Sequence, residues 1–367
     1  MQTKQWRAQI FEPMNYKSGK GADEGPDSNL ELTWAFGYNS SRTRNNLRYV
    51  AAANEADGPE SIVYHTATFG VVYQLKTRTQ KLYSGHSCEI VCLAMHPSSH
   101  IVATADVQSN IHVWNCKTLA CLSIIKGIVK EGTRMVAFSP DGNRISTIGL
   151  DADQTLAVYD VSACELIASA KGLTKPNIAH DITYSPDGTE LVMVGTYQIK
   201  YFTDVHTNKR AITSFFARIG KIGKRQTYFC AAYFKKDLMV GCADGNLYRI
   251  RNGICLDTIQ AHGVNESIMT MFYNQKEETL LTGGKDGQIK TWDATLHEVG
   301  TAVDISVVRR GASNSDVVHD CRISSIQQVR SVHSSALDVT AAKASPSPSV
   351  SPSASLSFSL TSYVAQS

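Results

Sequence analysis

Four side chains in the last third of the chain carry polar groups that can form a chain of hydrogen bonds. They are His262, Thr282, Asp286 and Trp292. A histidine, a hydroxyl and a carboxylate are the parts of a hydrolytic triad, in which the histidine takes the hydroxyl proton and the carboxylate orients the imidazole. The same groups can instead form a buried hydrogen-bonded relay that holds neighbouring strands together. The two interpretations differ in whether the set occurs once or recurs.

A second set with similar spacing lies earlier in the chain, at His86, Thr104 and Trp114. Gln108 stands where the later set has its aspartate, so we expect this earlier relay to be incomplete. A catalytic site does not recur at a repeat period, whereas a structural relay does. We therefore interpret both sets as structural, with each hydrogen bond contributing about 1 kcal/mol net to stability.

A basic segment follows the middle of the chain. It contains Arg218, Lys221, Lys224 and Arg225. Such a loop can attract an acidic partner through its charge, although we favour the alternative of a solvated loop between repeats. Its two glycines and its lysines do not have the spacing of a phosphate-binding loop, which also ends in Lys-Ser or Lys-Thr.

Nine cysteines, an odd number, are scattered along the chain. This pattern favours reduced, buried thiols over a disulfide framework. A zinc site is disfavoured because Cys88, Cys92, Cys116 and Cys121 lack the usual two-residue spacing. We expect neither a metal nor a cofactor.

The overall composition excludes several classes of protein. The net charge is only +3, which does not favour nucleic acid, since nucleic-acid binders concentrate basic residues on one face. No run of 18 apolar residues predicts a membrane span, and the first residues lack the apolar core of a signal peptide. We expect an intracellular protein with no small-molecule substrate.

A recurring pattern supplies the elements that position these side chains. An apolar strand is followed by a Pro-Asp-Gly turn and a second strand at residues 135–148, and the strand and turn recur at residues 182–188. Later repeats end in an aromatic residue and aspartate, as at Trp292-Asp293. A period of roughly 40 residues with these marks is typical of WD-repeat β-propeller blades, so the sequence predicts an all-β fold.

About six blades can be recognised, and a seventh is incomplete or absent. Their predicted strands lie within residues 47–83, 90–114, 135–159, 178–202, 229–250 and 268–292. A propeller protects its strand edges only when the ring closes. Either residues 306–340 form a poor seventh blade, or the chain is a truncated part of a larger protein, which is the alternative we favour.

Four regions follow from this division. Residues 1–28 are expected to be a flexible linker, residues 29–57 hold an aromatic cluster, and residues 58–305 form the propeller. Residues 306–367 become rich in serine, proline and alanine. Such a segment cannot bury enough apolar area to offset its ordering entropy, so we expect it to be disordered.

The aromatic cluster resembles a known motif. It comprises Trp34, Phe36, Gly37 and Tyr38, followed by Arg44-Asn45-Asn46-Leu47. This order resembles the hydrophobic motif of the echinoderm microtubule-associated protein-like (EMAP-like) family. The blades that follow are similar too, so the resemblance covers about residues 4–305.

The resemblance implies association with tubulin and microtubules, or with axonemal proteins. In that family the motif precedes two joined propellers, but this chain shows only one. We therefore expect Trp34, Phe36 and Tyr38 to form an exposed apolar patch. The chain has no heptad repeat, so we expect a monomer without the trimeric coiled coil of some members.

These observations predict a non-catalytic scaffold on microtubules or ciliary axonemes, in the cytoplasm. Two alternatives remain. The first is a general propeller adaptor in another assembly, such as a ubiquitin ligase or transport complex. The second is a propeller enzyme, which we disfavour because equivalent strands carry no central cluster of histidines or paired carboxylates.

Overall fold

Antiparallel strands joined by short turns form the regular structure. The computed structural model describes residues 32–38, 43–50, 61–98, 100–173, 176–205, 207, 212–275, 277–300, 302–304, 323, 325–328, 339–342 and 363–366. Within these ranges no helix is present that could cross a membrane. The strands all belong to the compact unit Trp34–Ser367, which is the part of the molecule described below.

Six four-stranded sheets follow one another in sequence, and each is a simple meander. We call them blades 1 to 6. Blade 1 holds β1 (Leu47–Val50), β2 (Ser61–Thr66), β3 (Phe69–Gln74) and β4 (Thr79–Tyr83). Blade 2 holds β5 (Ile90–Met95), β6 (Ile101–Asp106), β7 (Asn110–Asn115) and β8 (Cys121–Lys126). Blade 3 holds β9 (Thr133–Phe138), β10 (Arg144–Gly149), β11 (Leu156–Asp160) and β12 (Leu166–Ala170).

The second half repeats this arrangement. Blade 4 holds β13 (Ala179–Tyr184), β14 (Glu190–Gly195), β15 (Ile199–Thr203) and β16 (Thr213–Phe216). Blade 5 holds β17 (Tyr228–Phe234), β18 (Asp237–Cys242), β19 (Asn246–Arg251) and β20 (Ile254–Gln260). Blade 6 holds β21 (Ile268–Asn274), β22 (Thr279–Gly284), β23 (Gln288–Trp292) and β24 (Val303–Asp304). The predicted propeller with six recognisable blades is confirmed.

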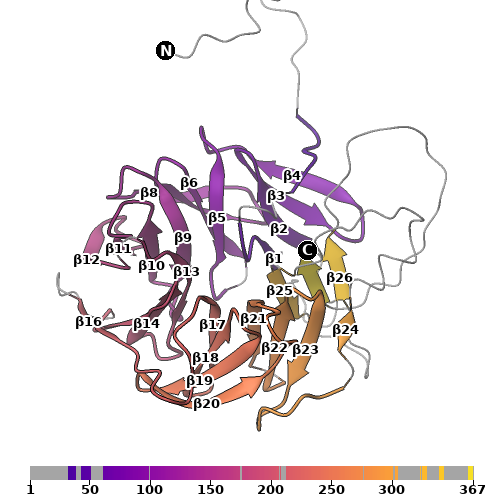
Figure 1. Ribbon diagram of the computed structural model, residues 1–367. Helices are drawn as coiled ribbons and strands as arrows, with labels where there is room; N and C mark the ends of the chain where they lie inside the picture. The colour runs from indigo at the N-terminus through magenta and orange to yellow at the C-terminus, as the bar shows by residue number, and fades with distance from the viewer. Residues whose placement is uncertain are drawn as a thin grey trace, which may run out of the picture. The chain divides into compact units, whose positions relative to one another are not determined.

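The first strand of each blade lies innermost, and the blades succeed one another around a common centre (Figure 1). Neighbouring inner strands touch, from β5 to β9, β9 to β13, β13 to β17 and β17 to β21. Because both faces of the middle strands are covered, strands such as β18 are buried along their whole length.

A three-stranded sheet lies between blades 6 and 1. It consists of β25 (Ser325–Gln328), β27 (Tyr363–Gln366) and β26 (Val339–Ala342), in that spatial order. Strand β25 contacts both β21 and β1, so this closing sheet occupies the place of the incomplete seventh blade (Figure 1).

The closing sheet adds regular structure to a region expected to be a disordered tail. Just before it, the buried side chain of Ile323 packs with Leu281 and Ile289. The Ile323 amide also donates to the Gly284 carbonyl at 3.1 Å. The other residues between 306 and 367 lie outside the described residues, as do the predicted linker at 1–28 and most of its boundary with the motif.

The Pro-Asp-Gly segments form tight turns. In the turn between β9 and β10, the Ser139 hydroxyl donates to Asp141, and Asp141 accepts from the Asn143 amide at 3.2 Å. Gly142 has a φ of 77°, which favours glycine. A Cβ atom here would lie 1.9 Å from Nε2 of His96 in blade 2. This glycine therefore permits close contact between neighbouring blades as well as the turn.

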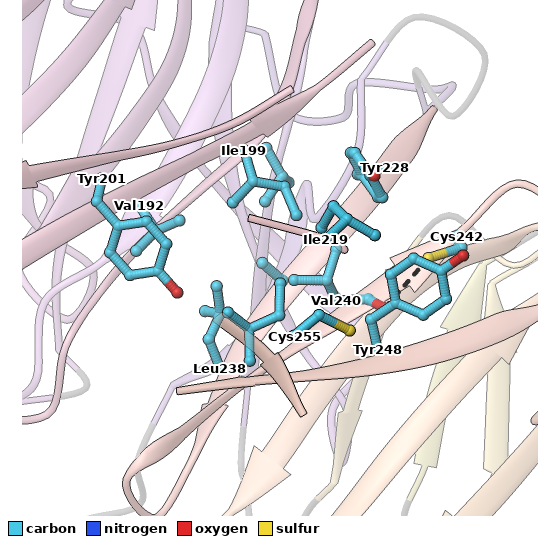
Figure 2. Close-up of a cluster of buried hydrophobic side chains, with 13 residues drawn as sticks. Val192, Ile199, Tyr201, Ile219, Tyr228, Leu238, Val240, Cys242, Tyr248 and Cys255 are labelled. Atoms are coloured by element: carbon cyan, nitrogen blue, oxygen red, sulfur yellow. Dashed lines mark hydrogen bonds between the residues drawn. The ribbon is translucent and has the colours of Figure 1, made fainter. Parts of the chain in front are cut away.

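Apolar clusters fill the spaces between blades. Figure 2 shows the cluster between blades 4 and 5, where Tyr201 and Val192 face Leu238. Val192 and Tyr201 are paired across β14 and β15. Full burial of one such side chain stabilises the fold by about 1.5–3 kcal/mol. These clusters join successive blades into one folding unit.

Candidate binding surfaces and the central cavity

The His262 relay in blade 6 is a continuous chain of hydrogen bonds from Trp292 to Asp286. His262 Nε2 lies 2.9 Å from Thr282 Oγ1, which also accepts a 3.0 Å bond from Trp292 Nε1. On its other side, His262 Nδ1 lies 2.9 Å from Asp286 Oδ2. Burial favours a higher pKa for Asp286, but its hydrogen bonds, led by that from His262, outweigh burial and hold the pKa below its ordinary value. Thr282 is fully buried, so its hydroxyl is not accessible from solvent.

Blade 2 contains the same relay, and here the expectation for Gln108 is wrong. His86 Nε2 lies 2.8 Å from Thr104 Oγ1, which accepts from Trp114 Nε1 at 3.1 Å. The carboxylate comes from Asp106, whose Oδ2 lies 3.3 Å from His86 Nδ1. The relay is therefore complete.

The carboxylate can reach the histidine from two positions in the turn. Asp106 takes the place that Gly284 has in blade 6, directly beside the histidine. A Cβ atom on Gly284 would lie 2.5 Å from His262 Nδ1 and 2.2 Å from Asp286 Oδ1. Glycine at that position thus makes room for Asp286 to reach in from the turn. In blade 6 the aspartate, Asp286, lies further along the chain from its threonine than Asp106 lies from Thr104 in blade 2. The spacing in blade 6 therefore does not identify Asp106.

The aromatic part of the hydrophobic motif packs on blade 1. Trp34 lies edge-on to Tyr73 with ring centroids 6.2 Å apart, and Tyr38 lies 5.6 Å from Tyr64. Between them, Phe36 is 83% exposed. The apolar patch is therefore narrower than expected, because Trp34 and Tyr38 find partners within this propeller.

The Arg-Asn part of the motif reaches across the ring to blades 5 and 6. Arg44 Nη1 donates to the Phe229 carbonyl on β17 at 3.1 Å, and the Arg44 guanidinium lies 4.8 Å from the Phe229 ring centroid. Asn45 accepts a 3.0 Å bond from Thr270 on β21. These contacts make the motif a structural tie between blade 1 and the last two blades.

The remaining motif residues fix the start of blade 1. Asn46 donates to Thr43 at 3.1 Å and accepts from the His65 amide at 3.2 Å. Leu47 is buried beside Tyr49. Of the motif side chains named here, Phe36 is the widely exposed one that remains available to a partner.

The inner strands surround an open cavity of about 390 Å³. Its lining includes ionisable side chains from three parts of the chain: Arg44 and Arg48 at or near β1, Arg134 on β9, and His180 and Asp181 on β13. Sequence reasoning missed this cavity. Polar residues that interrupt the otherwise apolar inner strands, such as Arg134 and the His180-Asp181 pair, were the available signal.

Burial perturbs the ionisable groups of this cavity. It raises the pKa of Asp181 to about 6, although amide hydrogen bonds and the charges of Arg44 and Arg48 act in the opposite direction. Burial, with the charges of Arg44 and Arg134, lowers the pKa of His180 to about 4. At neutral pH His180 is therefore uncharged and Asp181 is ionised.

The basic loop lies between β16 and β17, and its four cationic side chains, Arg218, Lys221, Lys224 and Arg225, are exposed. Buried Ile219 anchors it in the cluster between blades 4 and 5 (Figure 2). Its backbone is also held, because Arg218 N donates to the Gly253 carbonyl at 2.7 Å and Lys224 N to the Tyr248 hydroxyl at 2.8 Å. The four cations have no ion-pair partner among the described residues.

No group of three or more potential metal-binding side chains occurs in the part of the chain that the structure describes. The cysteines described there are all free, and Cys121 is exposed rather than buried. The expectation that every thiol is buried is therefore wrong for Cys121, which lies on the outermost strand of blade 2.

The fold and these features define a repeat-built β-propeller with an N-terminal motif that ties its first blade to its last. A protein-family model described as the echinoderm microtubule-associated protein first beta-propeller matches residues 79–323. A second model, the HELP motif, matches residues 25–71. The chain therefore belongs to the echinoderm microtubule-associated protein-like family.

Curated relatives carry the same family name. Rat echinoderm microtubule-associated protein-like 1 is 24% identical over 76% of this chain and 35% of its own length. The mouse like-2 protein is 26% identical over 78% of this chain and 45% of its own length. The Xenopus tropicalis like-4 protein is 25% identical over 75% of this chain and 31% of its own length. The chain thus spans less than half the length of these relatives.

Proposed function

We propose that this chain is a non-catalytic propeller that associates with microtubules through its basic loop, with the exposed Phe36 on blade 1 as a second, separate contact. The observation that carries this proposal is that the four cationic side chains of this loop have no ion-pair partner among the described residues. Arg218, Lys221, Lys224 and Arg225 are exposed on a backbone that is already fixed. Binding therefore orders little additional backbone, which keeps its entropic cost low.

Family membership supports the choice of partner, since the relatives are named for microtubule association. Acidic tubulin tails are suitable partners for a cationic loop, because complementary charge speeds encounter and selects the partner. The corresponding location is the cytoplasmic cytoskeleton, with the ciliary axoneme as a specialised case.

The relay geometry supports a non-catalytic role. Thr104 and Thr282 are each buried and bonded to both a histidine and a tryptophan. An activated nucleophile must be accessible to its substrate, and neither hydroxyl is.

Co-sedimentation of the full chain with microtubules tests the proposal. We expect the double variant Lys221→Glu with Lys224→Glu to weaken binding about tenfold or more, because each reversal replaces attraction with repulsion. The matched control reverses Lys76 and Lys117, two exposed lysines on blades 1 and 2. Binding should also weaken as salt rises, since salt screens exposed charges.

Failure of the unchanged chain to pellet with microtubules at low salt would remove direct binding and favour the adaptor alternative. Equal loss of binding in the control pair would show that total charge, and not the basic loop, governs association. A Phe36→Ser variant reports separately on the apolar contact.

A further inference from the structure

A second, smaller pocket of about 200 Å³ opens beside the basic loop and shares no lining residue with the central cavity. Its lining comes from the turn between β14 and β15, the end of β16, the basic loop and the start of β17. Three of the lining side chains are aromatic: Tyr197, Phe216 and Tyr228. Ile199 and Ile219 also line it, and both belong to the apolar cluster between blades 4 and 5 (Figure 2). The pocket is therefore a largely aromatic hollow beside a cationic loop.

Tyr197 is held in a backbone conformation that is uncommon for a bulky residue. Its φ is 60°, and its amide donates to the Gln226 carbonyl at 3.0 Å. In blades 2, 3, 5 and 6 the turns between the second and third strands place at positive φ the smaller or polar residues Ser109, Gln154, Gly245 and Gly287. Backbone strain of this kind concentrates at ligand-binding positions. Here it presents to the pocket a ring that is 55% exposed.

Phe216 is also fixed before any partner arrives. The Lys200 ammonium group lies 5.3 Å from the centroid of the Phe216 ring, which is within the range of a cation–π interaction. That ammonium group is itself anchored on the Lys171 and Gly172 carbonyls, at 2.7 and 3.1 Å. The Phe216 side chain nevertheless remains 51% exposed. Because this ring is already ordered, a partner that packs on it loses little of the binding free energy to side-chain ordering.

Positive charge adjoins these rings. Arg225 lines the pocket and is exposed, and Lys221 and Lys224 are exposed in the same loop. None of the three has an ion-pair partner among the described residues. A complementary partner therefore carries an apolar ring next to negative charge.

We propose that this pocket receives one aromatic side chain of an acidic peptide segment, whose carboxylates pair with the basic loop. The inference rests on the proposed contact of that loop with microtubules, and it adds an aromatic residue to the requirement for negative charge. A volume of about 200 Å³ is below the roughly 300–1,000 Å³ of small-molecule sites, which favours a single side chain as the occupant. An aromatic anchor in a pocket is typical of binding hot spots. The rings line a hollow, whereas entry into a lipid bilayer needs an apolar surface that projects.

Calorimetric titration of the full chain with two synthetic peptides tests the pocket. The first peptide is Glu-Glu-Gly-Tyr-Gly-Glu-Glu, and the second has alanine in place of tyrosine, so the two have the same charge. We expect the tyrosine peptide to bind about tenfold more tightly or better, because it alone supplies the aromatic anchor. The double variant Lys221→Glu with Lys224→Glu should weaken the binding of both peptides, since both depend on the charge of the loop.

Substitutions locate the aromatic contact. Tyr197→Gly and Phe216→Ala should each weaken binding of the tyrosine peptide about tenfold and leave binding of the alanine peptide unchanged. Tyr197→Gly also relieves the backbone strain at this position, so its melting temperature should not fall. The matched control is Phe215→Ala, because the Phe215 ring stacks on Tyr201 at 5.1 Å and does not line the pocket. This control should bind both peptides as the unchanged chain does.

Equal binding of the two peptides to the unchanged chain would overturn the pocket, while the charge-based contact with microtubules would stand. Pelleting with microtubules without binding of either peptide would overturn it as well. If the chain bound the tyrosine peptide through Tyr197 and Phe216 but did not pellet, the pocket would hold and the proposed function would fail. Binding of phosphatidylserine vesicles in place of the peptides would assign this surface to a membrane and remove the peptide site.

Discussion

Single side chains in this propeller differ sharply in how well their polar atoms are satisfied. His86 and His262 are buried with both ring nitrogens bonded. His65 on β2 is buried as well, yet neither of its ring nitrogens has a partner. Burial, together with the nearby His86, lowers the pKa of His65 to about 3. The same residue type is therefore fully hydrogen-bonded at two buried positions and unpaired at a third.

His65 should make the fold sensitive to acid. Its pKa is about 3 in the folded chain and about 6.5 in the unfolded chain. Between these values the unfolded state binds more protons, so stability falls as the pH drops from about 6.5 towards 3. We expect His65→Leu to remove up to a few kcal/mol of this loss, measured by urea unfolding over that pH range. The exposed control His297→Leu should keep the original pH dependence, and the same steepness in both variants would contradict the assignment.

The relay of blade 2 depends on Asp106, whereas sequence spacing points to Gln108. Besides His86, Asp106 accepts 2.9 Å bonds from the amides of Gln108 and Asn110. We expect Asp106→Ala to lower the free energy of unfolding by about 2–3 kcal/mol, because it leaves buried donors unpaired. Gln108 is exposed, so Gln108→Ala should change stability by less than about 0.5 kcal/mol. Chemical denaturation that ranks these two variants in the reverse order would refute the corrected relay.

At the scale of elements, the first three strands of each blade could be predicted, whereas the outermost strands of blades 2 to 6 could not. Strands such as β5 and β18 are apolar because both faces pack on neighbouring blades. In contrast, all four residues of β16 are exposed, and β8 is mostly so. An exposed edge strand has no buried face to impose an alternating pattern. The Pro-Asp-Gly turns were recognisable because their chemistry is local, whereas the cavity arises from residues far apart in sequence.

The turn at Gly142 also packs against the neighbouring blade. Comparing Gly142 with Gly220 separates the cost of a steric clash between blades from the cost of backbone strain. Both Gly142 and Gly220 have positive φ, at 77° and 67°. A Cβ on Gly142 would collide with His96, but one on Gly220 would have no atom within 4 Å. Gly220→Ala should cost about 1 kcal/mol from backbone strain alone, and Gly142→Ala should cost at least 1 kcal/mol more. Equal losses in thermal or urea unfolding would show that His96 yields without penalty.

At the scale of the whole molecule, closure of the ring rests on contacts that the repeat pattern does not encode. The motif ties blade 1 to blades 5 and 6 through Arg44 and Asn45. The closing sheet fills the interval between β21 and β1. The family of the chain could be recognised from the Arg44-Asn45-Asn46-Leu47 segment. The direction in which those side chains point could not, because they act through partners about 180–230 residues away.

Closure through the residues after blade 6 has a measurable consequence. Ile323 is buried against Leu281 and Ile289, and a Cβ on Gly283 would lie 2.8 Å from its side chain. Ile323→Ala should therefore destabilise the full chain by about 2–4 kcal/mol through the cavity that it leaves. Removal of residues 305–367 should cost more, because β1 and β21 then lose their contacts with β25, and the apolar surface exposed beside them favours self-association. Thermal melting and sedimentation velocity would measure the two effects. If the shortened chain melted like the full chain and remained monomeric, the six blades would close without the last strands.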